Sequence, residues 1–222
     1  MNYLSHAAAF LDEPLVAAGS VLPDFLSAMD RKCRVRAKRV DAYLATEPPG
    51  EPGRVAAGLR EHLADDHWFH GTEAFLTTQA RLTRRLRAAM PDDASHRVGF
   101  LGHILVELLL DGWIERTRPG TVGRFYDAMA AAAPTAMTEA VNASAARPTT
   151  RIIEVWPGFL RERFVADYVA DDRLRRRVNQ VLGRVGLPVL DEAAEATLAQ
   201  CRAEVEASAG RLLPQRVLNA LA

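Results

Sequence analysis

The chain has 222 residues, of which 28 are basic and 28 acidic, so its formal net charge at pH 7 is zero. This balance gives no support for a nucleic-acid partner, which usually requires a basic excess or patch. Hydrophobic residues make up 49% and charged residues 25%, as in an ordinary domain large enough to bury a core. The two cysteines form no disulfide framework, the start of the chain lacks the basic segment of a signal peptide, and the longest apolar run contains charged residues. We therefore expect a cytoplasmic protein without a membrane partner.

Helical periodicity dominates the chain, whereas the alternation typical of strands is scarce. Residues 30–53 are expected to be irregular at both ends, because a basic run opens them and a Pro/Gly-rich stretch closes them. Pro91, Asp92 and Asp93 are expected to separate two helices. The sequence thus predicts an all-α protein, a single-domain helical bundle over residues 1–222. The expected helices cover 3–10, 12–29, 54–70, 72–90, 95–117, 121–142, 157–170, 171–184, 190–210 and 213–221.

The segment 99–114 reads GFLGHILVELLLDGWI and carries His103, Glu107 and Asp111 in an otherwise apolar helix. Residues spaced by four drift only about 80° around a helix over this length, so the three share one stripe. Apolar neighbours surround the helix, and we expect the stripe to be largely buried. A buried carboxylate is normally paired, hydrogen-bonded or bound to a metal, because leaving it alone costs several kcal/mol or more.

A second stripe of the same spacing lies in residues 55–70, VAAGLREHLADDHWFH. It consists of His62, Asp66 and His70, with Asp65 beside it. Two such helices that face each other can build a metal site in a bundle core. The segment is polar on several sides, so a solvated helix face is an equally simple interpretation of this stripe taken alone.

The order of the polar segments adds a resemblance to a known family. The chain opens with MNYLSHAAAFLDEPLVAAGSVLPDF, continues with VAAGLREHLADD, and then has the apolar helix with its paired polar residues. This order resembles the acyl carrier protein phosphodiesterase family. Its members show a Met-Asn-Phe-Leu-Ala-His opening, a Gly-Asn-Leu-x-x-Asp-Phe segment, a Val-x-x-Gly-Ile-x-x-His-x-x-x-Asp helix and an apolar helix with two carboxylates. The matching residues are, in motif order, His6, Asp24, His62 with Asp66, and His103 with Glu107.

The resemblance covers roughly residues 1–115, which carry the site motifs. It is looser over residues 159–185, FLRERFVADYVADDRLRRRVNQVLGRV, which belong to the supporting helices in 121–222. It implies a helical fold related to the HD-type metal-dependent phosphohydrolases. It also implies release of phosphopantetheine from holo acyl carrier protein by phosphodiester hydrolysis, usually with manganese. The chain departs from the family at Ala8, where a second histidine is usual, and between His62 and Asp66, where arginines are usual. It also has Glu107-Leu108 where the family has Asp-His, so the substrate stays open.

Phosphodiester hydrolysis needs a nucleophile at neutral pH and neutralisation of the phosphoryl charge, and a divalent metal supplies both. A mixed histidine and carboxylate set suits manganese, which we expect, or iron or zinc. The candidate metal ligands are His6, Asp24, His62, Asp66 and His103. The candidate catalytic residues are Asp66 and Glu107, and the reserve candidates are Asp65, His70 and Asp111. The basic residues Arg31, Lys32 and Arg34 are candidates for holding a phosphate or docking an acidic carrier protein, with a solvated loop as the alternative.

Two other functions fit the same residues. The chain could be a helical metallohydrolase of the zinc phospholipase C or nuclease type. It could also be a non-enzymatic helical binding domain in which the polar residues pair with one another, for example His103 with Asp66. The alanine-rich segments 127–146 and 192–210 could pack within the chain or between two copies, so a homo-oligomer is possible.

Overall fold

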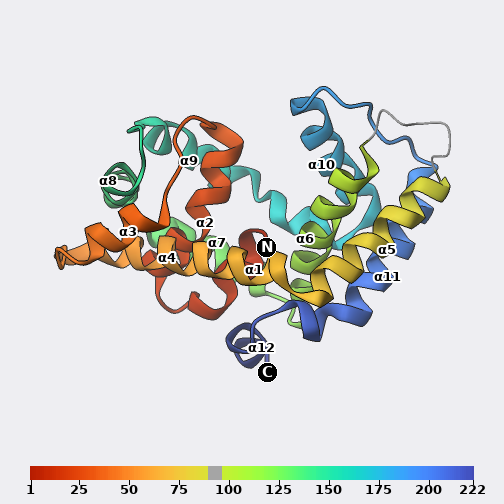
Figure 1. The fold of residues 1–222 in the computed structure, drawn as a ribbon, viewed down its shortest axis with the longest axis horizontal. Coiled ribbons are helices and arrows are strands. Elements are labelled where there is room, and N and C mark those ends of the chain that lie inside the picture. Colours follow the sequence, from red (N-terminus) through yellow and green to blue (C-terminus); the bar gives the residue numbers. More distant parts are fainter. Residues whose placement is uncertain (90–96) are drawn as a thin grey trace.

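Helices make up nearly all of the regular structure in the computed structural model, which describes residues 1–89 and 97–222 (Figure 1). No strand is present in these residues, where an isolated antiparallel bridge joins Val35 to Ala145. The all-α prediction is therefore confirmed, and buried side chains from both halves of the chain form one hydrophobic core. The helices are α1 (Tyr3–Ala7), η1 (Ala8–Phe10), α2 (Pro14–Met29), α3 (Ala37–Leu44), α4 (Gly50–Gly71), α5 (Glu73–Ala89), α6 (Val98–Thr117), α7 (Thr121–Ala131), α8 (Pro134–Ser144), α9 (Arg151–Glu162), η3 (Phe164–Val169), α10 (Asp171–Arg184), α11 (Ala194–Leu212) and α12 (Gln215–Leu221).

The short helix α1 lies between two groups of helices. In Figure 1, α2, α3, α7, α8 and α9 gather on the left, and α5, α6, α10 and α11 gather on the right. The long helix α4 runs from the left group to the middle of the molecule, and α1 contacts α2, α4 and α6. The N-terminal residues therefore occupy the junction at which both polar stripes of the sequence can meet.

Two glycines let α2 and α4 cross in backbone contact. A Cβ atom on Gly19 would lie only 2.1 Å from the carbonyl oxygen of Val55, and Gly58 faces Gly19 from the other helix. No other residue type fits this crossing without moving a helix. The close approach brings the backbone of α2 next to the polar stripe of α4.

Some helix boundaries differ from the sequence-based prediction. Helix α3 was not predicted, because its single buried residue, Val40, leaves almost no periodic pattern within a basic run. The helix expected over 121–142 is divided into α7 and α8, since Ala133 adopts an extended conformation before Pro134, which begins the next helix. The expected break at Pro91, Asp92 and Asp93 lies outside the described residues.

The segment expected as one helix over 157–170 is also divided. Helix α9 begins at Arg151 and includes Pro157, and it ends where Arg163 takes a left-handed conformation with φ of 43°. A 3-10 helix, η3, follows. A positive φ in an arginine is not visible in a hydrophobic pattern, so the sequence did not reveal this break.

Burial increases along the polar stripe of α6, contrary to the expected burial of the whole stripe. The exposed fraction of the side chain is 37% for His103 and 17% for Glu107, and Asp111 is fully buried. Phe100, in the first turn, is also 38% exposed. The first turns of α6 therefore border the solvent on the side of Phe100 and His103, whereas Leu101 and Leu105 of the same turns are buried in the core.

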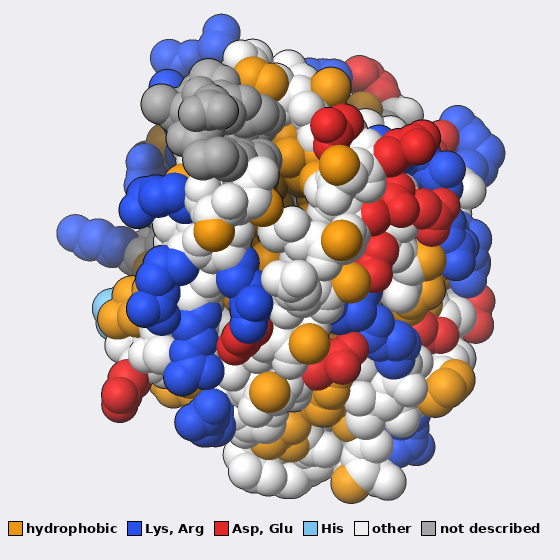
Figure 2. Space-filling model, turned by 90° about the vertical axis from the view of Figure 1, so that its right-hand side faces the viewer, with side chains coloured by type: hydrophobic (Ala, Val, Ile, Leu, Met, Phe, Trp, Pro, Cys, Tyr) orange, Lys and Arg blue, Asp and Glu red, His pale blue; other side chains and the backbone are white. Residues whose placement is uncertain are grey.

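None of the described helices combines the length and the apolar character that crossing a membrane requires. The face drawn in Figure 2 carries basic and acidic side chains next to one another. Ion pairs such as Arg81 with Glu204, 3.6 Å apart, join α5 to α11 on this side of the molecule.

Candidate metal centre

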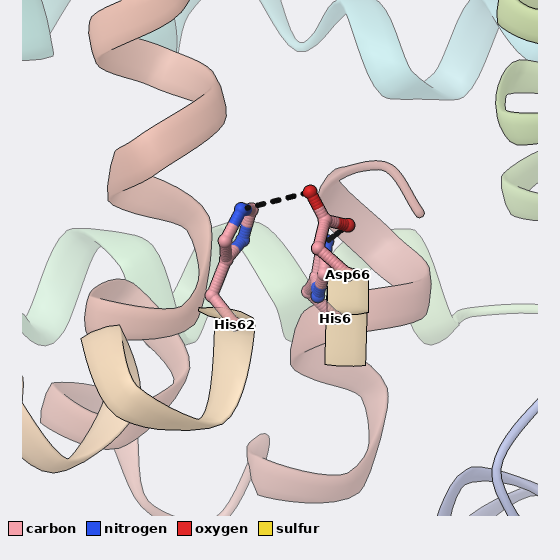
Figure 3. Close-up of side chains that lie close together, drawn as sticks. All are labelled: His6, His62 and Asp66. Atoms are coloured by element: carbon pink, nitrogen blue, oxygen red, sulfur yellow. Dashed lines mark ion pairs between the residues drawn. The ribbon is translucent and has the colours of Figure 1, made fainter. Parts of the chain in front are cut away.

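Three side chains from two helices form a first cluster: His6 of α1, and His62 and Asp66 of α4 (Figure 3). One nitrogen or oxygen of each lies within 4.8 Å of the others. Nε2 of His6 is 3.3 Å from Oδ1 of Asp66, and Nε2 of His62 is 3.6 Å from Oδ2. The two imidazole rings stack with centroids 3.9 Å apart. The fold thus brings together three of the five residues proposed as metal ligands.

His62 is held in one orientation by the backbone of α2. Its Nδ1 lies 2.8 Å from the carbonyl oxygen of Ser20, and because a carbonyl can only accept, Nδ1 carries the proton. Burial and the nearby His6 lower the pKa of His62 well below its ordinary value, so the ring is neutral and Nε2 bears a lone pair. That lone pair faces the Asp66 carboxylate, and two acceptors that face each other repel unless a cation lies between them.

His6 is fully buried, yet neither ring nitrogen makes a hydrogen bond within the described part of the chain. Burial lowers the pKa of His6, but the carboxylates of Asp65 and Asp66 raise it, and the net pKa is about 9. A buried polar atom without a partner is costly. Each nitrogen lies near a carboxylate, Nδ1 at 3.6 Å from Asp65 and Nε2 at 3.3 Å from Asp66, so a cation would bind His6 by displacing the proton that the carboxylates favour there.

Asp65, a reserve candidate for a metal ligand, lies behind His6. Its Oδ2 is 3.6 Å from Nδ1 of His6, and its Oδ1 accepts a hydrogen bond from the guanidinium of Arg216 on α12. A carboxylate in this position orients a histidine whose other nitrogen binds a metal. No pattern in the sequence marks Arg216, which is 151 residues away from Asp65 along the chain.

A second cluster contains His70 of α4 with His103 and Glu107 of α6. Nε2 of His70 lies 3.2 Å, and Nε2 of His103 3.4 Å, from Oε1 of Glu107. The two rings stack with centroids 4.9 Å apart. Burial raises the pKa of Glu107, but the Met1 amino group and the two histidines lower it, to about 2. The polar stripe of α4 therefore serves two clusters rather than one site.

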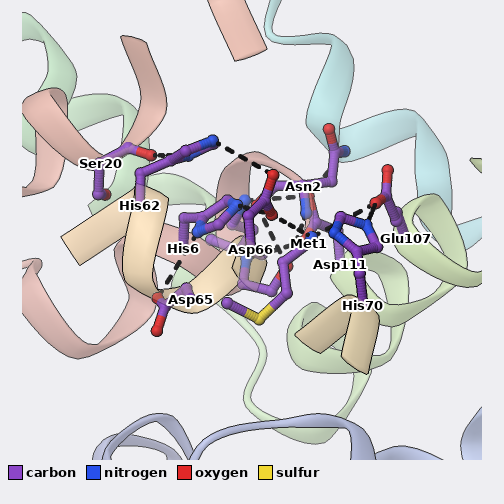
Figure 4. A network of polar contacts seen from close by, with 12 residues as sticks. Met1, Asn2, His6, Ser20, His62, Asp65, Asp66, His70, Glu107 and Asp111 are labelled. Carbon is purple, nitrogen blue, oxygen red and sulfur yellow. Dashed lines mark hydrogen bonds and ion pairs between the residues drawn. The ribbon is translucent and has the colours of Figure 1, made fainter. Parts of the chain in front are cut away.

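The amino group of Met1 lies between the clusters (Figure 4). It donates hydrogen bonds to Oδ1 of Asp66 at 2.9 Å and to Oε1 of Glu107 at 3.3 Å. Burial lowers the pKa of this amino group, but Glu107 and Asp66 raise it above its ordinary value. The two carboxylates thus face each other across one positively charged group.

Asp111, another reserve candidate, anchors α1 instead of contributing to either cluster. Its carboxylate accepts hydrogen bonds from the side chain of Asn2, the backbone N–H of Leu4, and both the N–H and the hydroxyl of Ser5, at 2.8 to 3.0 Å. Burial raises the pKa of Asp111 to about 6, although the bonds from Leu4 and Ser5 oppose this. Both oxygens are occupied by these donors, which fix the helix that carries His6.

Replacing Asp111 with asparagine is expected to lower the free energy of unfolding by about 3 kcal/mol, because an amide nitrogen would then face backbone donors in the core. Urea denaturation measures this change. Asp127→Asn, an exposed position on α7, is the matched control and should change stability little. Equal stability of the two variants would contradict the anchoring role.

Asp24 is a neighbour of the first cluster rather than a member of it. One of its carboxylate oxygens is buried without a hydrogen-bond partner in the described residues. Burial raises the pKa of Asp24 to about 7, and the charges of His6 and of the Met1 amino group oppose this rise. Its side chain is not among the donor atoms that lie within 4.8 Å of one another, so its role as a ligand stays a prediction.

The basic residues Arg31, Lys32 and Arg34 are exposed and follow the end of α2. Among the described residues, no hydrogen bond or ion pair joins them to either cluster. Their proposed contact with a phosphate or with a carrier protein therefore stays a prediction.

A scan of protein-family models, a search of curated proteins and a search of solved structures each returned no match. The resemblance to the acyl carrier protein phosphodiesterases therefore depends on the sequence motifs alone.

Proposed function

We propose that this protein is a metal-dependent phosphoester hydrolase. The observation that carries the proposal is the geometry of His62: its Nδ1 is held by the Ser20 carbonyl, and its Nε2 faces the Asp66 carboxylate at 3.6 Å. This pair, with the buried His6 beside it, is a set of two imidazoles and one carboxylate that fits a divalent metal. Manganese is the metal we expect, and iron and zinc suit the same donors.

His6, His62 and Asp66 would hold the metal. When bound, a divalent metal acidifies a water molecule and neutralises charge on phosphoryl oxygens. The protein supplies the orientation of both histidines, through Ser20 for His62 and through Asp65 for His6. Glu107 stays a candidate catalytic base, and the Met1 amino group and the two histidines beside it lower its pKa and so favour the ionised carboxylate.

Substrate would approach from the side on which the clusters are exposed. The side chains of Asp66, His70 and His103 are each about a third exposed, whereas His6 and His62 are buried behind them. A phosphodiester held at this opening would meet the first cluster through Asp66. Holo acyl carrier protein is the first substrate to test, because of the motif resemblance, and a cytoplasmic setting belongs to the same proposal.

The test is hydrolysis of holo acyl carrier protein and of bis(4-nitrophenyl) phosphate, with manganese, iron or zinc added to metal-free protein. We expect metal-dependent turnover by the unmodified protein and a loss of at least about 100-fold in His62→Ala. His67→Ala is the matched control, because His67 lies on the same helix but is exposed.

Full turnover by His62→Ala, or no metal-dependent turnover of either compound, would overturn the proposal. Turnover of bis(4-nitrophenyl) phosphate without turnover of holo acyl carrier protein would support phosphodiester hydrolysis and reject the carrier protein as the substrate. Phospholipid and nucleic acid would then be the next substrates to assay.

A further inference from the structure

We propose that His70, His103 and Glu107 bind a second metal ion, so that the centre holds two ions side by side. One donor atom from each residue lies within 4.8 Å of the others. The two histidine nitrogens approach the same oxygen, Oε1 of Glu107, from two different helices. Two imidazoles and one carboxylate that converge in this way are a donor set typical of zinc, manganese or iron sites.

Hydrogen bonds within the protein do not account for this convergence. Three nitrogen atoms, from Met1, His70 and His103, lie within 3.4 Å of Oε1 of Glu107. Of these, only Met1 and His70 have hydrogen-bond geometry towards the oxygen. One carboxylate oxygen has about two lone pairs, so the third nitrogen has no good partner there. A cation that binds all three side chains would satisfy His103 as well.

The second cluster is held in shape by its apolar surroundings. The ring of Phe75 lies edge-on to both histidines, with centroids 5.0 Å from His70 and 5.1 Å from His103. Gly102 allows α6 to approach α5 closely, because a Cβ at that position would lie 2.6 Å from the hydroxyl of Thr83. The Phe75 ring thus packs against both histidines, and the close approach of α5 and α6 keeps the two helices that carry Phe75 and His103 together.

The two clusters are adjacent. The same amino group contacts Asp66 of the first cluster and Glu107 of the second, so the two carboxylates face each other across a single cation. Centres with two ions commonly hold them about 3.5–4 Å apart and stabilise both the attacking and the leaving oxygen of a phosphoester. This use as a phosphoester site depends on the proposed function, whereas the binding of a second ion does not.

The test is the number of metal ions bound per chain, measured by elemental mass spectrometry after metal-free protein has been loaded with manganese or zinc and dialysed. We expect two ions in the unmodified protein and in His67→Ala. We expect one ion in His103→Ala and one in His62→Ala. Glu107→Gln should also bind one ion, and this variant tests the second site if His103→Ala fails to fold. Circular dichroism checks the fold of each variant.

Saturation of the unmodified protein at one ion, or retention of two ions by both folded His103→Ala and Glu107→Gln, would overturn the second site. The result is separable from the fate of the proposed function. Binding of two ions without turnover would reject the hydrolase and support the second site. Metal-dependent turnover by a protein that binds one ion would support the hydrolase and reject the second site.

Discussion

Replacing Gly58 with alanine is expected to lower the free energy of unfolding by about 3 kcal/mol. A Cβ at this position would lie 2.1 Å from the carbonyl oxygen of Val16 and 2.8 Å from Cα of Gly19. Both are backbone atoms, so no side-chain rotation relieves the overlap. Helix α2 would have to move away from α4, and the Ser20 carbonyl that orients His62 would move with it.

Gly58→Ala should therefore reduce metal binding as well as stability. Urea denaturation and metal content of the same preparation measure both effects. Gly123→Ala is the matched control, because a Cβ there meets no atom within 4 Å and alanine favours a helix by up to about 1 kcal/mol. Equal stability of Gly58→Ala and Gly123→Ala would contradict the close backbone contact between α2 and α4.

Replacing Asp66 with asparagine is expected to lower kcat/KM for the phosphodiester by at least about 100-fold, since loss of an indirect contact to a metal already costs about 10- to 100-fold. Asp66 contacts His6, His62 and the Met1 amino group at once. Asparagine keeps the shape of the side chain and removes the negative charge that a cation needs.

Asp41→Asn is the control for this variant, because Asp41 is exposed on α3. Steady-state kinetics at several metal concentrations would separate weaker metal binding from slower chemistry. Activity of Asp66→Asn equal to that of Asp41→Asn, at metal concentrations near those that saturate the unmodified protein, would contradict the role of Asp66.

The sequence predicted the helical character of the chain and the residues that share each polar stripe. The i, i+4 spacing placed His62, Asp66 and His70 on one side of a helix, and the structure has them there. Spacing along one helix does not say which other helix each residue will meet. The division of the stripes into two clusters therefore became visible only with α1 and α6 in place.

Other parts of the site had no signal in the sequence. Arg216 reaches Asp65 from 151 residues away, and a single arginine in a short C-terminal helix has no pattern that marks it. Asp111 belongs to the same stripe as Glu107, but it serves backbone donors of α1, which no side-chain pattern encodes. Long-range packing decides both roles.

The two clusters depend on one uninterrupted helix, and this limits how the chain can vary. Each residue added to a helix turns everything beyond it by about 100°. An insertion or deletion between His62 and His70 would leave one cluster in register and rotate the other out of its partner helix. Substitutions at outward-facing positions such as Ala64 and His67 leave that register untouched. The number of residues between His62 and His70 is thus more strongly constrained by the two clusters than the identity of most residues in this segment.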